Sequence, residues 1–502
     1  MGRRTRARAG AVRARGGVVA VLATVILMSG CTVNADWLGR LFDPGHSSRT
    51  PDTGLTAASA PTLKQKWRLQ GPGCSGAGTG GGWLATPVTF KGVIYVGSNF
   101  GCLYAINEAD GTVKWSKFTA YQPKQTCVQR LGIVASVRVE DDGTGNPVLY
   151  FHSGDGFLYK LNGGDGSQIW KSVVQVPSPT QNDVFAWSSP TVANGKVIIG
   201  VSSNCDTPFV QGQVRAYDAT TGNLLWIHKT VPDGFVGAGD WYDAAVDGAG
   251  NVYVTTGSVT DAQAVAHPNT TAGFEQYSIL KLDGSNGNLV WKAPAPKHTA
   301  DPDYASSPIL FNGGGVALVG ATNKDGWFRV YRQDNGALAW QALVGNATPD
   351  GGSSALSGGV WDGSHLFVMS NTTTVGGTWT QSPPGQWTPV GGTSVPGSIR
   401  QLDPATGDIA SVGGVRFELG LPSNPLGPCS INGNGILVCA GGHLGAVLTA
   451  HDNGLFLVDT TQPPAVLRQL EDVKNFGGFG QPAQENGAIL AANTDALSKW
   501  AQ

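Results

Sequence analysis

The chain has 502 residues, of which 73 are glycine and 29 are proline, while charged residues make up only 14%. Nucleic-acid binders and coiled coils need dense charge, so this composition excludes both classes and any nucleic-acid partner. With 41% hydrophobic residues, including 15 Trp and 17 Phe, the chain can bury a large core and is not globally disordered. Short strands joined by glycine-rich turns are the architecture that remains.

The first thirty residues have the order of a bacterial export signal. Six arginines precede the apolar stretch Val18–Met28, which is too short to span a bilayer with ease. Two small residues and Cys31 follow, and this order resembles the lipobox of bacterial lipoproteins, although Met28 stands where Leu, Val or Ile is usual. We therefore expect residues 1–30 to be a signal peptide and a lipidated Cys31 to hold the exported protein on the outer side of the cell membrane. An ordinary secretory signal, with Cys31 incidental, is the alternative.

Residues 31–60 are expected to be a flexible tether between the anchor and the folded domain. The stretch from Ser47 to Pro61 is rich in Ser, Thr, Pro, Ala and Gly, and it shows neither helical nor strand periodicity. Removal of residues 1–30 changes the net charge from −2 to −8, because that segment holds six arginines and no acid. The charge of the remaining chain therefore implies no acidic partner.

From Leu63 onward the chain repeats one pattern, and this repeat predicts the fold. A strand leads into a tight turn with a glycine, and a Trp follows four residues later, as in Gly222 and Trp226. The five clearest copies end at Trp115, Trp170, Trp226, Trp291 and Trp340. Two more strands precede each copy, so each unit is predicted to be a four-stranded antiparallel sheet. The turn glycine should take a positive φ, and the Trp should pack between neighbouring units.

Eight such units account for residues 61–502. Two further copies end near Ser411 and Leu467, where the Trp is lost. Trp67 closes a unit whose first three strands have not yet appeared, so the C-terminal segment GAILAANTDALSKW is expected to supply them. We therefore predict an all-β, eight-bladed β-propeller closed by strands from both termini, with seven blades as the alternative. Such closure hides the sheet edges. We also expect a monomer.

The repeat resembles that of the quinoprotein alcohol dehydrogenase-like superfamily, whose propellers are built from repeats of the pyrroloquinoline quinone (PQQ) type. Its signature is most complete as Ala216, Asp218, Thr221, Gly222 and Trp226. The resemblance covers about residues 61–502 and implies a propeller. It does not imply one function, since the superfamily includes PQQ-dependent dehydrogenases, polymer-oxidising relatives and an outer-membrane assembly lipoprotein that binds no quinone.

Propeller geometry places four candidate residues at one mouth of the central channel. If the strands of a blade run from the axis outward, the loops entering first strands and the loops following second strands open on the same face. Trp241 and Asp303 precede first strands, whereas Ser258 and Lys324 follow second strands. Such a mouth is a common place for a ligand.

The resemblance assigns a role to each of these positions. Trp241 matches a residue that stacks on the quinone. Lys324 matches a basic residue that hydrogen-bonds a quinone carbonyl, where a cation favours negative charge on the reduced cofactor. Asp303, with Asp301 as a nearby alternative, matches the catalytic aspartate that ligates calcium and removes the alcohol proton. Ser258 stands where the family has a calcium-ligating asparagine.

The site also departs from the family pattern, and the departures lower the expected calcium affinity. Ser258 replaces the asparagine, and the ligating glutamate has no counterpart, with Asp206 the nearest acid. The vicinal cysteine pair of many family members is missing as well. We therefore expect a ligand-binding or protein-interaction propeller with a degraded quinone and calcium site, whose partner is an unknown envelope protein or small molecule. The alternative is a PQQ- and calcium-dependent dehydrogenase that oxidises an alcohol or sugar and passes electrons to an external acceptor.

Each candidate side chain also has a purely structural interpretation. Trp241 can pack between blades, as a Trp before a first strand commonly does. Asp206 and Asp303 can cap turns through hydrogen bonds to the backbone. Lys324 lies in an Asn-Lys-Asp-Gly turn and can be a solvated turn lysine. The insert Thr372–Pro396, rich in Gly, Thr, Pro and Trp, is a candidate lid over one face.

Six cysteines follow Cys31, and an even number in an exported chain favours disulfides. None of them forms a CxxC or CxxCH motif, so neither a zinc ribbon nor covalently attached haem is expected. Cys429 and Cys439 flank a hairpin centred near Asn434 and should lie opposite each other across it.

The other four cysteines are expected on the mouth face. Cys74 and Cys127 lie in loops that enter first strands, while Cys102 and Cys205 follow second strands. We favour the pairs Cys74–Cys102, within one blade, and Cys127–Cys205, between two neighbouring blades. Other pairings of the cysteines remain open.

Overall fold

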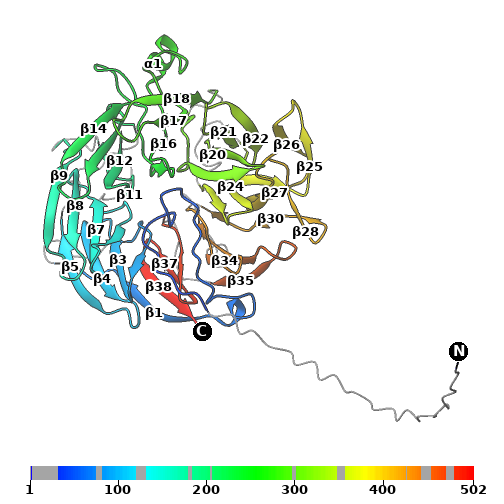
Figure 1. The fold of residues 1–502 in the computed structure, drawn as a ribbon, viewed down its shortest axis with the longest axis horizontal. Coiled ribbons are helices and arrows are strands. Elements are labelled where there is room, and N and C mark those ends of the chain that lie inside the picture. Colours follow the sequence, from blue (N-terminus) through cyan, green and yellow to red (C-terminus); the bar gives the residue numbers. More distant parts are fainter. Residues whose placement is uncertain are drawn as a thin grey trace. The chain divides into compact units, whose positions relative to one another are not determined.

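The computed structural model describes residue 2 and residues 32–502, except for residues 75–81, 120–131, 179–183, 204–205, 297–300, 347–356, 426, 443–453 and 471–479. In this part of the chain, eight sheets of four or more strands surround a central axis, with successive blades following one another around the ring (Figure 1). The prediction of an all-β propeller with eight blades is therefore confirmed, and the alternative of seven blades is wrong. No helix among the described residues is long and apolar enough to cross a membrane.

The first four blades use strands that are consecutive or nearly so in the chain. Blade 1 consists of β2 (Val88–Phe90), β3 (Val93–Gly97), β4 (Cys102–Asn107) and β5 (Val113–Phe118). Blade 2 consists of β6 (Arg138–Asp141), β7 (Pro147–His152), β8 (Phe157–Asn162) and β9 (Gln168–Val173). Blade 3 consists of β11 (Thr191–Ala193), β12 (Lys196–Ser203), β13 (Gln213–Asp218) and β14 (Leu224–Lys229), with β10 (Val184–Phe185) paired to the end of β12. Blade 4 consists of β15 (Ala245–Val246), β16 (Val252–Thr255), β17 (Ser278–Leu282) and β18 (Leu289–Pro294).

The next three blades carry insertions between or beside their strands. Blade 5 consists of β19 (Ile309–Gly313), β20 (Val316–Thr322), β21 (Trp327–Arg332) and β22 (Leu338–Leu343). Blade 6 consists of β23 (Gly359–Trp361), β24 (Leu366–Val375), β27 (Thr393–Leu402) and β30 (Glu418–Leu421). Blade 7 consists of β32 (Ser430–Ile431), β33 (Ile436–Gly442), β34 (Gly454–Asp459) and β35 (Val466–Leu470), with β31 (Asn424–Pro425) also paired to β33. The remaining elements are α1 (Asp261–Ala266), the 3-10 turn Ala60–Thr62 and the short pair β28 (Ser411–Val412) and β29 (Val415–Arg416).

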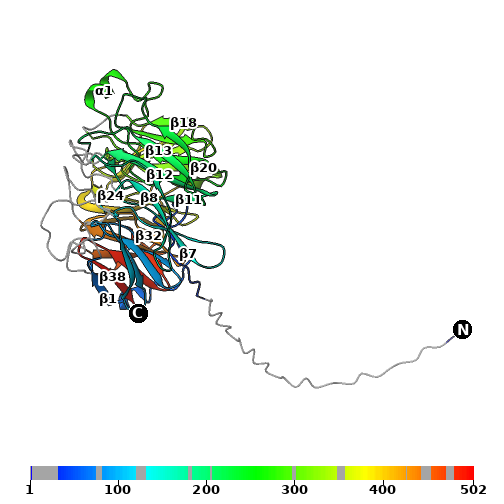
Figure 2. The same cartoon turned by 90° about the vertical axis from the view of Figure 1, so that its left-hand side faces the viewer.

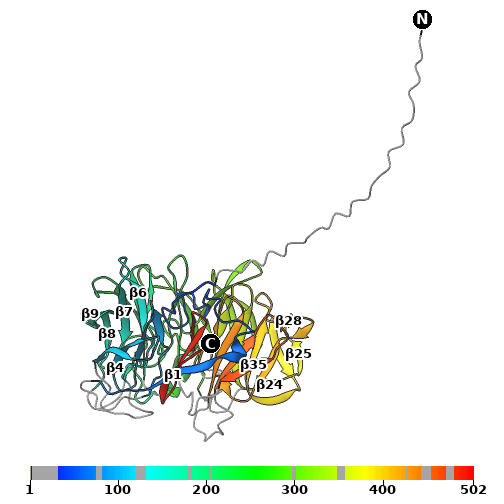
Figure 3. The ribbon, with the colours of Figure 1, turned by 90° about the horizontal axis from the view of Figure 1, so that it is seen from below.

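Blade 8 closes the ring with strands from both ends of the chain. Its three inner strands are β36 (Ala483–Glu485), β37 (Ala488–Ala492) and β38 (Ala496–Ala501), and its outermost strand is β1 (Lys64–Gln70). Strands β1 and β38 run antiparallel, with Lys64 opposite Ala501, so the C-terminus lies beside β1 (Figures 2 and 3). The closure predicted from Trp67 and the C-terminal repeat is thereby confirmed.

The repeated glycine and tryptophan join each blade to the next. Gly222 has a φ of 76°, and a Cβ atom there would lie 2.7 Å from the ring of Trp170 in the preceding blade. Gly287 stands in the same relation to Trp226, whose indole Nε1 also donates to the backbone oxygen of Gly284 at 3.1 Å. The positive φ and the close approach of the ring both require glycine, which is why the repeat keeps this residue.

The insert between β24 and β27 is not a lid over a face. It forms the hairpin β25 (Thr378–Gln381) and β26 (Gln386–Val390), which Figure 1 shows at the outer rim. Strand β26 pairs in parallel with β22, so the hairpin extends the outer edge of blade 5 by two strands. The unpaired backbone groups of β22 draw the insert to the edge of the sheet, because an edge strand offers free hydrogen-bonding groups.

Residues 33–59, here called the N-terminal strap, are not a flexible tether. Trp37, Leu41 and Leu55 are buried in the propeller. Backbone oxygens of the strap accept hydrogen bonds from the first strands of blades 1, 2, 4, 5, 6 and 7, donated by Thr89, Val139, Val246, Leu310, Trp361 and Ile431. The prediction failed because the strap satisfies its backbone groups against the inner strands rather than through a periodic element of its own.

Candidate functional site

The loops predicted to meet at one mouth of the channel do meet there. Ser258 follows β16, Asp303 precedes β19, and the Ser258 hydroxyl donates to Asp303 Oδ1 at 2.6 Å. Lys324 follows β20, and its ammonium donates to Asp303 Oδ2 at 2.9 Å. A Cβ atom on Gly257 would lie 3.0 Å from Asp303 Oδ1, so this glycine leaves room for the buried carboxylate. Both oxygens of Asp303 are therefore engaged by side chains of the neighbouring turns.

The Lys324 ammonium is shared between two carboxylates. Its Nζ lies 2.6 Å from Asp301 Oδ2, as well as 2.9 Å from Asp303 Oδ2. Burial opposes the charged form of Lys324, but the two carboxylates outweigh it and raise the pKa of the ammonium. Burial and the charge of Asp303 raise the pKa of Asp301 to about 6. Lys324 is thus a charged, buried lysine and not the solvated turn residue of the structural interpretation.

Asp206 is the third carboxylate of this cluster. It follows β12 at an exposed position on the rim, with a φ of 56°. The protein atoms packed around it limit its hydration, and together with the charge of Asp303 they raise its pKa to about 7. With Asp206, Asp301 and Asp303 all ionised, three negative charges face the single positive charge of Lys324. The cluster consequently holds protons more tightly than isolated aspartates do.

Trp241 forms the floor beneath the Lys324 ammonium. The Nζ atom lies 5.3 Å from the centre of the Trp241 ring, within the range of a cation–π contact. Trp241 packs on Tyr242 with 4.2 Å between ring centroids, and it also contacts the apolar pair Val134 and Trp187. The indole is partly exposed, so Trp241 is both a packing residue and part of the mouth surface.

The residues present do not assemble a calcium site in this arrangement. The part of the chain that the structure describes contains no group of three or more His, Cys, Asp or Glu placed to hold a metal ion. Calcium takes six to eight oxygen ligands, but the Lys324 ammonium lies between Asp301 and Asp303, and Ser258 occupies the other oxygen of Asp303. The same ammonium covers the Trp241 face on which a planar quinone would have to stack.

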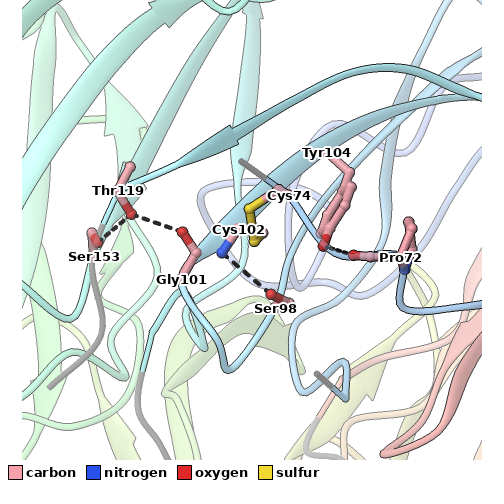
Figure 4. The surroundings of a disulfide bond; sticks show 8 residues. All are labelled: Pro72, Cys74, Ser98, Gly101, Cys102, Tyr104, Thr119 and Ser153. Atoms are coloured by element: carbon pink, nitrogen blue, oxygen red, sulfur yellow. Dashed lines mark hydrogen bonds between the residues drawn. A yellow bond between two sulfur atoms is a disulfide. The ribbon is translucent and has the colours of Figure 1, made fainter. Parts of the chain in front are cut away.

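Two disulfides support the loops of the propeller, and both have the predicted partners. Cys74 and Cys102 are joined with 6.1 Å between their Cα atoms, and this bond ties the loop entering blade 1 to the start of β4 (Figure 4). Cys429 and Cys439 are joined across the first hairpin of blade 7, with 4.4 Å between their Cα atoms. Cys127 and Cys205 lie outside the described residues, so their pairing remains a prediction.

Below the mouth, the starts of the first strands are linked from blade to blade around the channel. We call the linking residues the girdle, and they are Thr86, Ser136, Ser189, Asp243, Ser307 and Gln481. Five residues of this set donate their backbone N–H to the side-chain oxygen of the next, in the order Gln481 to Thr86, Thr86 to Ser136, Ser136 to Ser189, Ser189 to Asp243 and Asp243 to Ser307.

The girdle was not predicted from the sequence, although a signal was present. A hydroxyl residue stands two positions before the first strand of blades 1, 2, 3, 5 and 6, and blade 4 carries Asp243 in the same place. A second missed residue is Asp240, which is fully buried and whose two carboxyl oxygens have no hydrogen-bond partner among the described residues. Burial, followed by the charge of Asp243, raises the pKa of Asp240 far above its ordinary value.

Comparison with known proteins finds similar proteins among quinone-dependent dehydrogenases. A family profile described as the β-propeller domain of glucose, ethanol and alcohol dehydrogenases matches residues 42–342. A polyvinylalcohol dehydrogenase of a Pseudomonas species is 26% identical over 352 residues, which covers 60% of this chain and 50% of the relative. Quinohemoprotein alcohol dehydrogenase ADH IIB of Pseudomonas putida is 26% identical over 301 residues, covering 53% of this chain and 42% of the relative. The chain spans half or less of the length of the curated relatives it matches.

Solved structures of similar proteins agree on the fold. The quinohemoprotein alcohol dehydrogenase of Comamonas testosteroni superposes with a TM-score of 0.65 at 18% identity, over 93% of this chain and 80% of that one. A europium-containing methanol dehydrogenase superposes with a TM-score of 0.67 at 16% identity, over 92% of this chain and 89% of that one. At these identities the likeness supports the propeller architecture alone.

Proposed function

Because this chain belongs to the family of glucose, ethanol and alcohol dehydrogenase β-propeller domains, we propose that its channel mouth descends from a quinone and calcium site and now serves another binding role. In this proposal the protein is an envelope propeller that binds a small ligand or a partner protein at the mouth. Its family membership alone does not decide between binding and catalysis, since one fold serves many functions.

The observation that carries this proposal is the position of Lys324. Its ammonium lies within 2.9 Å of both Asp301 and Asp303 and also lies over the ring of Trp241. One lysine thus pairs with the carboxylates that a calcium ion would need and blocks the aromatic face that a planar cofactor would need. Ser258 and Asp206, in place of the family's asparagine and glutamate, weaken the metal site further.

Export and lipid anchoring are part of the proposal and rest on the N-terminal sequence. The six arginines, the short apolar stretch and Cys31 support a lipoprotein signal, with the mature chain on the outer face of the membrane. Metabolic labelling with an alkyne fatty acid tests this point. Label on the wild type and none on the Cys31→Ser variant supports the anchor, whereas equal label on both excludes it.

A PQQ- and calcium-dependent dehydrogenase for an alcohol or sugar is the second candidate. It is favoured by the convergence of Asp303, Lys324 and Trp241 at one mouth, and by relatives that carry the names of quinone-dependent alcohol and polyvinylalcohol dehydrogenases. For this candidate Lys324 would have to leave Asp303 and the indole face when a ligand enters.

A titration of the purified protein with PQQ and calcium separates the two candidates. Tryptophan fluorescence and thermal melting report binding, with Asp303→Ala as the site variant and the exposed Asp334→Ala as its matched control. The binding proposal expects no calcium-dependent quenching or stabilisation at high micromolar PQQ. Tight, calcium-dependent quenching that Asp303→Ala abolishes and Asp334→Ala preserves would establish the dehydrogenase candidate instead.

A further inference from the structure

We propose that the N-terminal strap plugs the central channel beneath the mouth, and that Arg40 of the strap is a positioning residue for the floor of the site. The inference rests on the proposed function only in taking Trp241 as that floor. The observations that carry the inference form a chain of contacts that runs from the strap, through Asp243 and Tyr242, to Trp241.

The strap crosses the channel from blade 8 to blade 5, three blades further round the ring. The backbone N–H of Leu41 donates to Gln481 Oε1 of blade 8 at 2.7 Å, while the His46 Nδ1 atom lies 2.8 Å from the backbone oxygen of Pro308 at the start of blade 5. Leu41 and His46 are each only 3% exposed. Two small pockets beside Arg40 are lined by strap residues together with residues at the starts of the first strands of blades 2 to 7, so the strap packs against the inner wall of the channel at this level.

The backbone of the strap is held in an unusual shape. Leu41, Phe42, His46 and Ser48 all have positive φ values, of 61°, 72°, 67° and 59°. Residues with a side chain rarely adopt this conformation, and it persists where the surroundings dictate it. The contacts with the inner strands therefore impose the shape that brings Arg40 onto the girdle.

Arg40 compensates the one carboxylate of the girdle. Its Nη1 lies 2.6 Å from Asp243 Oδ2, and the two side chains are only 7% and 3% exposed. The other oxygen of Asp243 accepts the backbone N–H of Ser189 at 2.6 Å. Blades 1, 2, 3, 5 and 6 carry hydroxyl residues at this position and blade 8 carries Gln481, so Asp243 introduces a buried negative charge that needs a cationic partner.

The same guanidinium supports the aromatic floor. Arg40 Cζ lies 5.7 Å from the centre of the Tyr242 ring, Tyr242 packs on Trp241, and the Lys324 ammonium lies above Trp241. Two cations thus hold two packed aromatic rings between them, one cation from the strap and one from the mouth. Asp243 is the next residue after Tyr242, so a movement of its carboxylate also moves the backbone that carries both rings.

Loss of the Arg40 charge should loosen the floor. Asp243 would keep a buried charge without the guanidinium that pairs with it. An unpaired buried carboxylate recruits water or takes up a proton, and either outcome disturbs residues 240–243. The plug therefore both closes the pocket from below and fixes the orientation of Trp241.

Two ligand-free measurements test this inference. The first is hydrogen–deuterium exchange of the peptides that cover residues 239–246 and 186–192. The second is near-ultraviolet circular dichroism. The part of this signal that is lost in Trp241→Phe is assigned to the packed Trp241 and Tyr242 rings. The variants are Arg40→Gln, the double variant Arg40→Gln with Asp243→Asn, and Arg49→Gln, which removes an exposed arginine of the same strap.

The inference expects Arg40→Gln to exchange at least tenfold faster in residues 239–246 and to lose the ring signal, while Arg49→Gln matches the wild type. The double variant should recover much of both signals, because an asparagine still accepts the Ser189 N–H and leaves no uncompensated charge. Unchanged exchange and an unchanged ring signal in folded Arg40→Gln would overturn the inference. If Arg40→Gln does not fold, the double variant decides: recovery of fold and ring signal supports the role of Arg40, and failure to recover overturns it.

These readouts are independent of the proposed function. Neither needs a bound ligand, so a mouth that binds PQQ, another ligand or nothing gives the same exchange pattern if Arg40 positions the floor. A failed ligand titration and a failed exchange experiment are therefore distinguishable.

Discussion

The Lys324 ammonium and the Asp303 carboxylate form a buried ion pair, 2.9 Å apart, with side chains only 12% and 10% exposed. The resemblance to quinoproteins assigns calcium binding and proton removal to Asp303 and a hydrogen bond to the quinone to Lys324. Here they contact each other directly. The mouth is consequently an internally ion-paired cluster, and several measurable properties follow from that arrangement.

Removal of the Lys324 charge should create cation affinity at the mouth. In Lys324→Gln, the carboxylates of Asp301 and Asp303 have no ammonium between them, so a calcium ion loses its competitor for these oxygens. We expect calcium to bind this variant about tenfold or more tightly than it binds the wild type, a difference of about 1.4 kcal/mol or more. Calorimetric titration at pH 8 measures the affinity. Lys229→Gln, which removes an exposed lysine, is the control. Equal calcium affinity in wild type and Lys324→Gln would contradict the assignment of the ammonium to the metal position.

Asp206 should make the folded state less stable as the pH rises. Its pKa is about 7 in the folded state against an ordinary value near 3.8, so between these values the folded state binds more protons than the unfolded state. The free energy of unfolding therefore falls as pH rises through this window. Urea denaturation at pH 5 and pH 7.5 should show a smaller loss in Asp206→Asn than in the wild type. Identical losses in the two proteins would mean that Asp206 titrates normally.

The turn glycines that touch a tryptophan should tolerate alanine less well than those that touch nothing. Gly222 and Gly195 have similar φ values, 76° and 73°, but only a Cβ atom on Gly222 would meet a ring, that of Trp170. Both alanine variants carry the backbone strain, of about 1 kcal/mol. Gly222→Ala should lose a further 1–3 kcal/mol, roughly, from overpacking. Urea unfolding of both variants compares the two losses, and equal losses would show that the Trp contact contributes nothing.

The third disulfide is still a prediction. With Cys74–Cys102 and Cys429–Cys439 formed, Cys127 and Cys205 remain as partners among the six cysteines that follow Cys31. Peptide mapping without reduction should find Cys127 linked to Cys205. Free thiols at both positions, or a link from either one to Cys31, would refute this pairing.

Much of the architecture could be predicted from the sequence because the repeat encodes it locally. Each pair of a turn glycine and a tryptophan indicates one blade. Trp67 ends a blade whose first three strands do not precede it in the chain, and this indicated that the C-terminal segment closes the ring. The convergence of Ser258, Asp303 and Lys324 followed from the same geometry, since a propeller assigns each loop to a face.

The strap, the girdle and the ion pairs of Lys324 could not be predicted in this way. Residues 33–59 carry no periodicity because they add their backbone groups to strands far away in the chain, so a composition rich in small residues suggested a tether. Arg40 and Asp243 are 203 positions apart, and no local pattern links them. Whether Lys324 faces a cofactor or its own neighbours depends on side-chain distances that spacing does not specify.

The measurement that tests the central claim most directly is reconstitution of the purified protein with PQQ and calcium, followed by gel filtration, an absorption spectrum and a dye-linked oxidation assay on alcohols and sugars. Because Lys324 pairs with Asp301 and Asp303 and lies over Trp241, we expect that no PQQ stays with the protein and that no substrate is oxidised. Retention of about one PQQ per chain, with oxidation that Asp303→Ala abolishes, would contradict the account and make this propeller a working quinoprotein.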